Sequence, residues 1–419
     1  MIDLKSLRAS PGQVRAALAR RGDATLTRLL DEIEALDMKR RTLTAQLDQL
    51  KAERNDAARA DALVAKSQGG LPEATATARR KLGDRIAALE SELRQIETTL
   101  EAKTLFVPNQ PLPEVPEEQT TLRTWGTPAP KGGQPHWEIA ERLGILDLPR
   151  GAKLAGSGFP VLMGTGARLA RALINFMLDL HAREHGYIEV APPFLVRRET
   201  MIGTGQLPKF EDDVYRTATD DLFLIPTAEV PVTNLHRDEI LDGASLPKGY
   251  VAYTPCFRRE AGAAGKDTRG LLRVHQFDKV ELVRFCRAAD SPAEHEKLTG
   301  HAEEVLRRLE LPYRVAVLPA NDFGFAAAKT YDLEAWAPGV GQWLEVSSSS
   351  TFTDYQARRA NIRCRPRPGE KPEFVHTLNA SGVALPRTIA ALLETHQQPD
   401  GSVTLPPALV PYVGADRLA

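Results

Sequence analysis

The sequence predicts an α+β domain built on a mostly antiparallel sheet, preceded by an N-terminal arm of two antiparallel coiled-coil helices. Two heptad runs of apolar residues near the N-terminus predict the arm. Strand-like segments mixed with helical ones in the rest of the chain predict the α+β domain. The chain has 419 residues, of which 42% are hydrophobic and 26% charged, and this is typical of a globular protein with more than one domain.

The arm is predicted from the spacing of its apolar residues, which recur at alternating steps of three and four. These seam residues are Leu26, Leu29, Ile33, Leu36, Leu43, Leu47, Leu50 and Ala57, and then Leu82, Ile86, Leu89, Leu93, Ile96 and Leu100. Arg40 and Arg54 interrupt the first run, and a Gly-Gly pair and a proline within 67–74 separate the two runs. We therefore expect an arm over about 26–105 with its tip near 67–74. A dimerisation coiled coil between two chains fits the same spacing.

A stretch rich in proline and glycine, 108–135, predicts a linker between two domains. The expected domains are 1–107, which carries the arm, and 136–419. In the second domain we expect a helix over 166–186, followed by strands at 187–193, 221–227, 250–257, 273–285 and 342–350.

The composition limits the possible functions. The formal net charge is −1, so a nucleic acid would have to bind through local patches. Neither a P-loop nor a dinucleotide-binding glycine motif is present. The scattered cysteines Cys256, Cys286 and Cys364 fit a reducing compartment and predict no zinc site, and His181 and His185 are more typical of a structural helix than of a metal site. The N-terminus has no signal-peptide pattern and no apolar run approaches 18 residues, so we expect a cytoplasmic protein with no membrane span.

Opposite charges crowd into a predicted hairpin at 257–282. If both strands alternate regularly, one face presents Arg258 and Glu260 from the first strand and Phe277, Lys279 and Glu281 from the second. Such a face could clamp a phosphate, stack on a base and accept hydrogen bonds from an ammonium group. A salt-bridged surface hairpin would explain the same charges.

The hairpin sequence FRREAGAAGKDTRGLLRVHQFDKVEL closely resembles the second signature motif of the seryl-tRNA synthetases, which are class II aminoacyl-tRNA synthetases. GARLARALINFMLDLHAREHGYIEVAPP resembles their first motif, and LIPTAEVPVTN resembles their serine-binding loop. KTYDLEAWAPGVGQWLEVSSSSTFTDYQARRANIR and HTLNASGVALPRTIAALLE resemble the fourth block and the third motif. Together with the coiled coil, the resemblance covers nearly the whole chain and implies the class II antiparallel sheet flanked by helices.

The resemblance implies ATP-dependent attachment of L-serine to tRNA(Ser) through a seryl-adenylate, with Arg258 and Arg387 as the catalytic cations on the phosphates. The implied ATP contacts are Arg258, Arg259, Glu260, Val274, Phe277, Glu345, Val346, Ser347, Ser348 and Arg387. The implied serine contacts are Thr227, Ala228, Glu229, Arg258, Glu281, Asn379 and Ser381. The implied metal is Mg²⁺, held by Glu345 and Ser348.

The resemblance also implies a homodimer in which the arm of one subunit guides tRNA(Ser), and tRNA(Sec) where a cell has it, to the other subunit's active site. The candidate tRNA contacts near the tip are Arg54, Arg59, Lys66, Arg79, Arg80 and Lys81. The glycine-rich loop 261–270 is expected to contact the acceptor end of the tRNA.

Two other functions compete with this one. An amino acid:carrier-protein ligase paralogue would lack the arm. A non-catalytic tRNA-binding paralogue would be expected to have lost Arg258, Glu345 or Arg387, and all three are present.

Overall fold

The computed structural model describes residues 1–68, 72–261 and 269–419, which form two compact units. The first, which we call the arm unit, is Ile2–Val107. The second, which we call the sheet unit, is Pro108–Ala419 with Met1.

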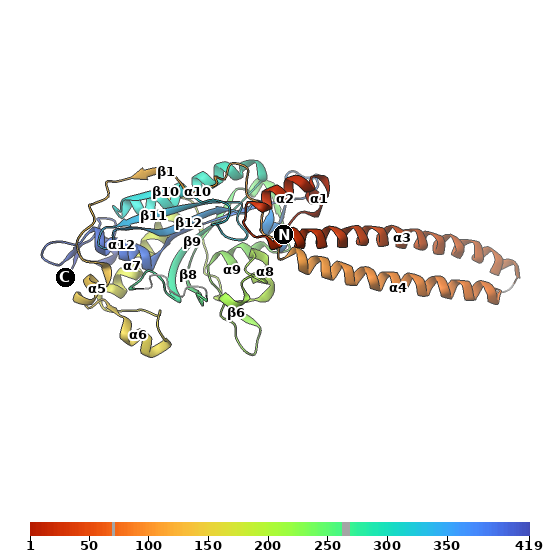
Figure 1. The fold of residues 1–419 in the computed structure, drawn as a ribbon, viewed down its shortest axis with the longest axis horizontal. Coiled ribbons are helices and arrows are strands. Elements are labelled where there is room, and N and C mark those ends of the chain that lie inside the picture. The colour runs from red at the N-terminus through yellow and green to blue at the C-terminus, as the bar shows by residue number, and fades with distance from the viewer. Residues whose placement is uncertain (69–71, 262–268) are drawn as a thin grey trace. The chain divides into compact units, whose positions relative to one another are not determined.

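The arm unit consists of four helices: α1 (Leu4–Ala9), α2 (Pro11–Ala19), α3 (Thr25–Gln68) and α4 (Glu73–Thr104). Figure 1 shows α3 and α4 running antiparallel, side by side. Ion pairs join them, for example Lys39 Nζ to Glu92 Oε1 at 2.8 Å and Lys51 Nζ to Glu90 Oε1 at 2.9 Å. One chain therefore supplies both strands of the coiled coil, and a second chain is not needed to cover the seam.

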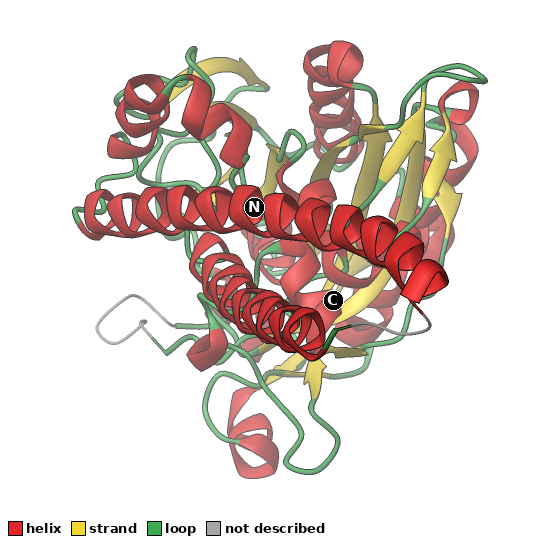
Figure 2. Cartoon of the chain, turned by 90° about the vertical axis from the view of Figure 1, so that its right-hand side faces the viewer, coloured by secondary structure: helices red, strands yellow, loops and turns green. Residues whose placement is uncertain are grey.

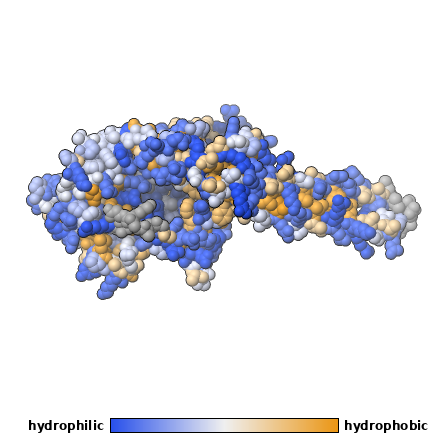
Figure 3. Space-filling model, in the orientation of Figure 1, coloured by the Kyte–Doolittle hydropathy of each residue, from blue (hydrophilic) through white to orange (hydrophobic). Residues whose placement is uncertain are grey.

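The predicted seam is buried or half-buried along the described part of both helices, with Ile33 at 0% and Ile86 at 3% exposure. On the face drawn in Figure 3, hydrophilic residues dominate the surface of the arm, with hydrophobic patches between them. Part of the expected tip, residues 69–71, lies outside the described residues.

The break in the heptad pattern at Arg40 has a structural cause. Arg40 Nη2 donates to Asp37 Oδ1 at 2.9 Å, and Arg8 of α1 donates to Asp37 Oδ2 at 2.9 Å. Burial alone would raise the pKa of Asp37, but the hydrogen bonds from Arg8 and Arg40 hold it below its usual value. The charged residues at this level thus attach α1 to the base of the coiled coil.

The sheet unit is built on an eight-stranded sheet with the order β1-β10-β11-β12-β15-β9-β8-β4. All neighbouring strands pair antiparallel except β4 and β8, which are parallel. The strands are β1 (Thr120–Trp125), β4 (Ile188–Glu189), β8 (Lys248–Phe257), β9 (Gln276–Cys286), β10 (Tyr313–Val317), β11 (Lys329–Ala337), β12 (Gln342–Thr351) and β15 (His376–Ala384). The mostly antiparallel sheet predicted from the sequence is confirmed.

Helices of this unit pack against the strands of the sheet, and Figure 2 draws the helices in red and the strands in yellow. The helices are α5 (His136–Arg142), α6 (Leu148–Ala155), α7 (Thr165–Asp179), α8 (Arg198–Thr204), α9 (Glu229–Thr233), α10 (Ser291–Arg308), α11 (Tyr355–Ala360), α12 (Leu385–Thr395) and α13 (Val410–Val413). Leu169, Leu173 and Met177 of α7 pack in one core with Val280 and Leu282 of β9. This core fixes which face of β9 remains for the site.

Short elements complete the sheet unit. They are β2 (Leu146–Asp147), β3 (Val161–Leu162), β5 (Leu195–Arg197), β6 (Leu222–Leu224), β7 (Ile240–Asp242), β13 (Arg363–Arg365), β14 (Glu373–Phe374), β16 (Val403–Thr404) and β17 (Arg417–Leu418). They form one three-stranded and three two-stranded sheets separate from the eight-stranded one.

The structure differs from the sequence prediction at the expected linker. Residues 108–135 include the edge strand β1, which pairs with β10. Asn109 Nδ2 also donates to the Phe352 carbonyl at 2.7 Å from a buried position. Proline-rich composition here marks an extended segment packed on the sheet unit, not a free connection.

The helix predicted over 166–186 is observed as α7, which is followed directly by a π-helical turn, Leu180–Glu184. His181 Nδ1 and His185 Nδ1 are 2.9 Å apart there, and no group of three side chains suited to a metal ion occurs among the described residues. The three cysteines are free and buried. Within the described ranges we find no helix with the length and apolar composition needed to cross a membrane.

Candidate active site

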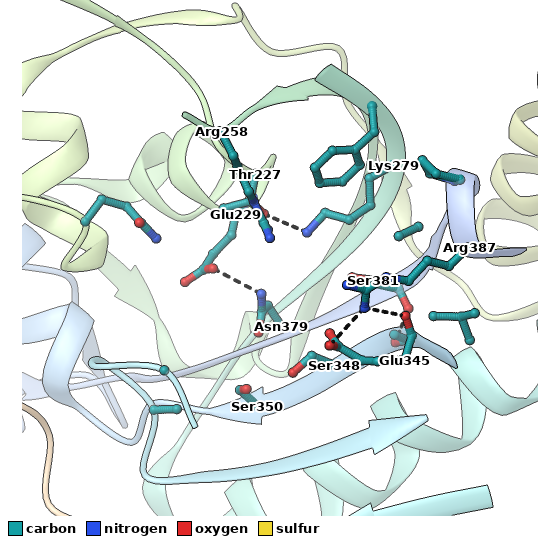
Figure 4. A pocket seen from close by; sticks show the side chains of 18 of the residues that line it. Thr227, Glu229, Arg258, Lys279, Glu345, Ser348, Ser350, Asn379, Ser381 and Arg387 are labelled. Carbon is teal, nitrogen blue, oxygen red and sulfur yellow. Dashed lines mark hydrogen bonds and ion pairs between the residues drawn. The ribbon is translucent and has the colours of Figure 1, made fainter. Parts of the chain in front are cut away.

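A cavity of about 360 Å³ opens on the sheet unit, bounded by β9, β12, β15, the start of α12 and the connection before β9. Thirteen of the predicted site residues line it: Thr227, Glu229, Arg258, Glu260, Val274, Phe277, Glu345, Val346, Ser347, Ser348, Asn379, Ser381 and Arg387. In Figure 4 the labelled side chains converge on the cavity from several elements, with Thr227 and Glu229 toward one end and Glu345 and Arg387 toward the other. The fold therefore brings together residues that lie far apart in the chain.

At one end of the cavity, five polar side chains form a hydrogen-bonded cluster. Thr227 Oγ1 donates to Glu281 Oε2 at 2.7 Å and accepts from Lys279 Nζ at 2.9 Å. Lys279 also forms an ion pair with Glu281. Asn379 Nδ2 donates to Glu281 Oε1 at 2.9 Å. It also donates to Glu229 Oε2 at 3.1 Å (Figure 4). All of these side chains are buried, so each charge depends on its protein partners or on a ligand.

Strand register places this cluster. Phe277, Lys279 and Glu281 alternate with Val280 on β9, and Val280 belongs to the helix-covered core, which confirms the predicted division of faces. Ser381 of the neighbouring strand β15 lies opposite Glu281 in the register. The polar residues of two adjacent strands are therefore directed to the same side of the sheet.

Glu229 has an unusual electrostatic environment. Burial raises its pKa to about 7, and the nearby Glu281 carboxylate adds to the effect. Gln356 Nε2 and Asn379 Nδ2 donate to its two oxygens. No lysine or arginine forms an ion pair with Glu229 in the part of the chain that the structure describes. A cationic group of a ligand would stabilise its ionised form.

The hairpin prediction is wrong for Arg258 and Glu260. The strand β8 ends at Phe257, so both residues lie in the connection beyond it, and Glu260 has a φ of 51°. Both nevertheless line the cavity. The Arg258 guanidinium lies over the Phe277 ring at 5.1 Å from its centroid, and Glu260 pairs with Arg273.

The other end of the cavity is formed by β12 and the start of α12. A β-bulge in β12 leaves Val346 without a partner on β11, which shifts the side-chain alternation and brings both Glu345 and Ser348 to the cavity. Arg387 Nη1 donates to Glu345 Oε2 at 3.1 Å and to the Glu345 carbonyl at 2.9 Å. Ser347 Oγ donates to the Ser381 carbonyl at 2.6 Å and so ties β12 to β15.

Three predicted site residues do not line the cavity. Glu281 is buried directly behind Thr227 and belongs to the polar cluster. Ala228 is buried in the core next to it. Arg259 is exposed, and its backbone N–H donates to the Asp213 carbonyl at 3.0 Å. Residues 262–268 of the expected tRNA-contacting loop lie outside the described residues.

The sequence prediction gave no site role to Lys279, Gln356 or Asp332. Lys279 lies between Phe277 and Glu281 on the same face of β9, so strand alternation was a sufficient signal for it. Gln356 is on α11 and contacts Glu229 from behind, and no local pattern pointed to it. Asp332 of β11 lies opposite Ser348 in the register. Burial and the Glu345 charge raise its pKa to about 8.

The candidate tRNA contacts on the arm unit are not equivalent. Arg54, Arg59, Lys66, Arg80 and Lys81 are exposed. Arg79 crosses to α3, where its Nη2 donates to the Ala57 carbonyl at 3.0 Å and it pairs with Asp61. Arg79 thus has a role in joining the two helices, while the other five remain accessible.

Comparisons with known proteins identify both parts of the chain. Residues 1–111 match the seryl-tRNA synthetase N-terminal domain, and residues 209–396 match the tRNA synthetase class II core domain (G, H, P, S and T). The serine–tRNA ligase of Gemmatimonas aurantiaca is 55% identical, with both chains fully covered. The serine–tRNA ligase of Geobacillus kaustophilus is 53% identical over 99% of both chains.

Among solved structures, a seryl-tRNA synthetase from Pyrococcus horikoshii complexed with ATP is 39% identical, with a TM-score of 0.94 over 100% of this chain and 99% of that one. The cytoplasmic serine–tRNA ligase of Naegleria fowleri in complex with AMP is 30% identical, with a TM-score of 0.84 over 97% of this chain and 94% of that one. With full-length relatives at this identity, the chain belongs to the seryl-tRNA synthetase family of class II aminoacyl-tRNA synthetases.

Proposed function

We propose that this protein attaches L-serine to tRNA(Ser) in two steps. In the first, an oxygen of the serine carboxylate attacks the α-phosphorus of ATP, and pyrophosphate leaves to give seryl-adenylate. In the second, the 3′-hydroxyl of the terminal tRNA adenosine attacks the seryl carbonyl, and AMP leaves. The proposal rests on one cavity that contains both a buried carboxylate cluster and the guanidinium groups of Arg258 and Arg387. The chain is also 55% identical over its length to a serine–tRNA ligase. The same reactions would serve tRNA(Sec) in a cell that makes it, and we place them in the cytoplasm.

Activation in this site needs positioning and charge neutralisation but no side-chain nucleophile. We assign Arg258 to the α-phosphate and Arg387 to the γ-phosphate. A guanidinium group can donate two parallel hydrogen bonds to two oxygens of one phosphate. Phe277 offers a ring for the adenine, and Glu260, Val274 and Arg259 complete the proposed nucleotide contacts. The hydrogen bond from Arg387 to Glu345 would be exchanged for one to a phosphate when ATP binds.

The end of β12 fits a hard divalent cation such as Mg²⁺. Glu345 and Ser348 offer oxygen ligands, which Mg²⁺ prefers. Asp332 lies opposite Ser348 on the neighbouring strand, and its Oδ1 is buried and has no hydrogen-bond partner among the described residues, so one carboxylate oxygen beside these ligands has no donor to satisfy it. Mg²⁺ bound there would neutralise charge on the phosphates, and Val346 and Ser347 would hold the strand in place.

Serine recognition is assigned to the polar cluster. Glu229 and the Ala228–Thr227 segment would take the α-ammonium, and Glu281, Asn379 and Ser381 would lie around the side-chain hydroxyl. A site whose buried polar groups are paired by that hydroxyl rejects alanine, because alanine would leave them unpaired.

We further propose that the arm binds the tRNA and that two copies of the chain form the working enzyme. The exposed basic residues toward the arm tip suit a phosphate backbone. The strand β4 is the last in the sheet order, and Ile188 on it is 53% exposed, which is an open edge that a second copy could cover. Sedimentation of the purified protein tests the dimer.

The decisive test is ATP–pyrophosphate exchange driven by serine, alanine, glycine or threonine. We expect exchange with serine, and no serine-dependent exchange would refute the proposal. Deleting residues 30–100 should preserve this exchange and abolish tRNA charging. If the protein were instead a carrier-protein ligase, the deletion would not change its transfer of the amino acid to the carrier.

A further inference from the structure

A chain of buried side chains lies behind Glu229, on the side away from the cavity. Gln356 of α11 is 0% exposed and its Nε2 donates to Glu229 Oε1. Thr377 of β15 is also 0% exposed, and its Oγ1 donates to Gln356 Oε1 at 2.7 Å. Three separate elements, α9, α11 and β15, thus meet at one amide group. The proposed reaction does not use Gln356 or Thr377 directly.

The orientation of the Gln356 amide is determined by its surroundings. The Thr204 carbonyl lies 3.3 Å from Gln356 Nε2, on the same end of the amide as the Glu229 carboxylate. A carbonyl oxygen can only accept, so this end of the amide must be the NH₂ group. The Thr377 hydroxyl then donates to the opposite end, which is the amide oxygen. Glu229 therefore always meets a donor on this side.

The two oxygens of Glu229 are held by amide donors from opposite sides, Gln356 Nε2 at Oε1 and Asn379 Nδ2 at Oε2. Asn379 also donates to Glu281, whereas Glu229 is the one side-chain acceptor of Gln356 among the described residues. The charged groups around Glu229 are Glu281 and Lys279 of β9 and Arg258 beyond β8, and none of the cations pairs with it within the described residues. The carboxylate is thus fixed in orientation but lacks a positive partner.

We propose that Gln356, held by Thr377, is a positioning residue that orients the Glu229 carboxylate to receive the α-ammonium group of the amino-acid substrate. This inference rests on the proposed function, in which the cavity binds serine. It assigns a role to a side chain that does not touch the substrate. Hydrogen bonds to a charged group contribute more than neutral ones, so losing this donor should weaken ammonium binding about tenfold or more.

The test compares Gln356→Met with the unmodified full-length enzyme in pyrophosphate exchange. Methionine keeps the length of the side chain and removes all three hydrogen bonds of the amide, with Glu229, Thr204 and Thr377. We expect the KM for serine to rise about tenfold or more, while the KM for ATP stays within about twofold. Thr377→Val should change the serine KM in the same direction by a smaller factor. Because it alters only one hydroxyl, it keeps the proposal testable if Gln356→Met folds poorly.

Two inhibitors separate positioning from a general loss of structure. Serinamide keeps the ammonium group and lacks the carboxylate, whereas 3-hydroxypropionate lacks the ammonium group. In Gln356→Met the inhibition constant of serinamide should rise about as much as the serine KM, and that of 3-hydroxypropionate should not. Thr299→Val is the matched control, since Thr299 is buried and hydrogen-bonded to Ser349 Oγ at 2.9 Å without contacting Glu229. It should leave both inhibition constants unchanged.

The pH dependence gives a third readout. Binding of the ammonium group needs the ionised Glu229 carboxylate, so the serine KM of the unmodified enzyme should fall as pH rises through about 7, the raised pKa of Glu229. Removing a donor to the ionised form should move this midpoint to higher pH in Gln356→Met, and Gln356→Glu should move it further.

An unchanged serine KM, or equal weakening of serinamide and 3-hydroxypropionate, would overturn the inference while leaving the proposed function intact. Absence of serine-dependent exchange in the unmodified enzyme would instead refute the proposed function and the inference with it.

Discussion

The buried ion pair between Lys279 and Glu281 leads to a quantitative prediction about stability. Lys279 is 5% exposed and Glu281 is 1% exposed, so neither charge has access to much water. Replacing Lys279 with Met removes the cation and leaves the Glu281 carboxylate buried. Breaking such a pair from one side costs about 3–5 kcal/mol, because the remaining charge is uncompensated.

The expected cost lies at the lower end of that range. Glu281 would keep two neutral donors, Thr227 Oγ1 at 2.7 Å and Asn379 Nδ2 at 2.9 Å. We therefore expect Lys279→Met to lower the free energy of unfolding of the sheet unit by about 3 kcal/mol. In a large domain, where 1 kcal/mol shifts the melting temperature by about 2 °C, this corresponds to a decrease of about 6 °C.

The assay is scanning calorimetry of the full chain in the absence of ligands. Lys39→Met is the matched control, because the pair of Lys39 with Glu92 is exposed and should contribute less than about 1 kcal/mol. The double variant Lys279→Met with Glu281→Gln removes both charges and should recover most of the lost stability. The reasoning would be refuted if Lys279→Met had the same melting temperature as the unmodified protein, or if the double variant were no more stable than Lys279→Met alone.

Three further predictions concern charge elsewhere. Glu229→Gln should make the unfolding free energy of the sheet unit less dependent on pH between about 4.5 and 7. The pKa of Glu229 is raised to about 7, so the unmodified protein loses stability as this carboxylate ionises with rising pH. Unfolding free energies from denaturant titrations that change equally with pH in both proteins would contradict this. Asp37→Asn should destabilise the arm unit by about 2 kcal/mol at pH 7. The difference should vanish as pH falls through the lowered pKa of Asp37, where the unmodified protein also loses its charge, and helical circular dichroism measures it. Arg80→Glu with Lys81→Glu should weaken tRNA charging at low salt and leave serine-dependent pyrophosphate exchange unchanged, and equal charging rates would exclude these residues as tRNA contacts.

The coiled coil could be predicted because its signal is local. Each helix carries its own heptad spacing, and a break between the runs is enough to favour a fold-back. The interruption at Arg40 could not be understood in the same way, because its cause is Asp37 together with Arg8, which belongs to a different helix. Periodicity identifies the buried stripe of a helix, but it does not identify the polar group that replaces an apolar residue within it.

The hairpin shows the same limit in a sheet. The faces of β9 followed from period-two alternation, and Phe277 and Lys279 indeed line the cavity. Alternation failed for Arg258 and Glu260 because the pairing of β8 with β9 ends at Phe257 and Gln276. Where a ladder ends depends on how the two strands align, and the sequence of one strand does not contain that information. The resemblance to a known family, not the alternation, placed these two residues in the site.

The crowding of opposite charges in the hairpin has an explanation in the charge balance of the polar cluster. When Glu229 and Glu281 are both ionised, Lys279 neutralises only one of them, which leaves one excess negative charge in a buried site. An amino acid is a zwitterion, so its ammonium group would balance that charge while its carboxylate would be free to turn toward Arg258. A surface hairpin would have no reason to bury Lys279 and Glu281, or to lie against a carboxylate, Glu229, that has no ion-pair partner among the described residues. The buried imbalance, more than the number of charges, is what favours a ligand site over a salt-bridged surface.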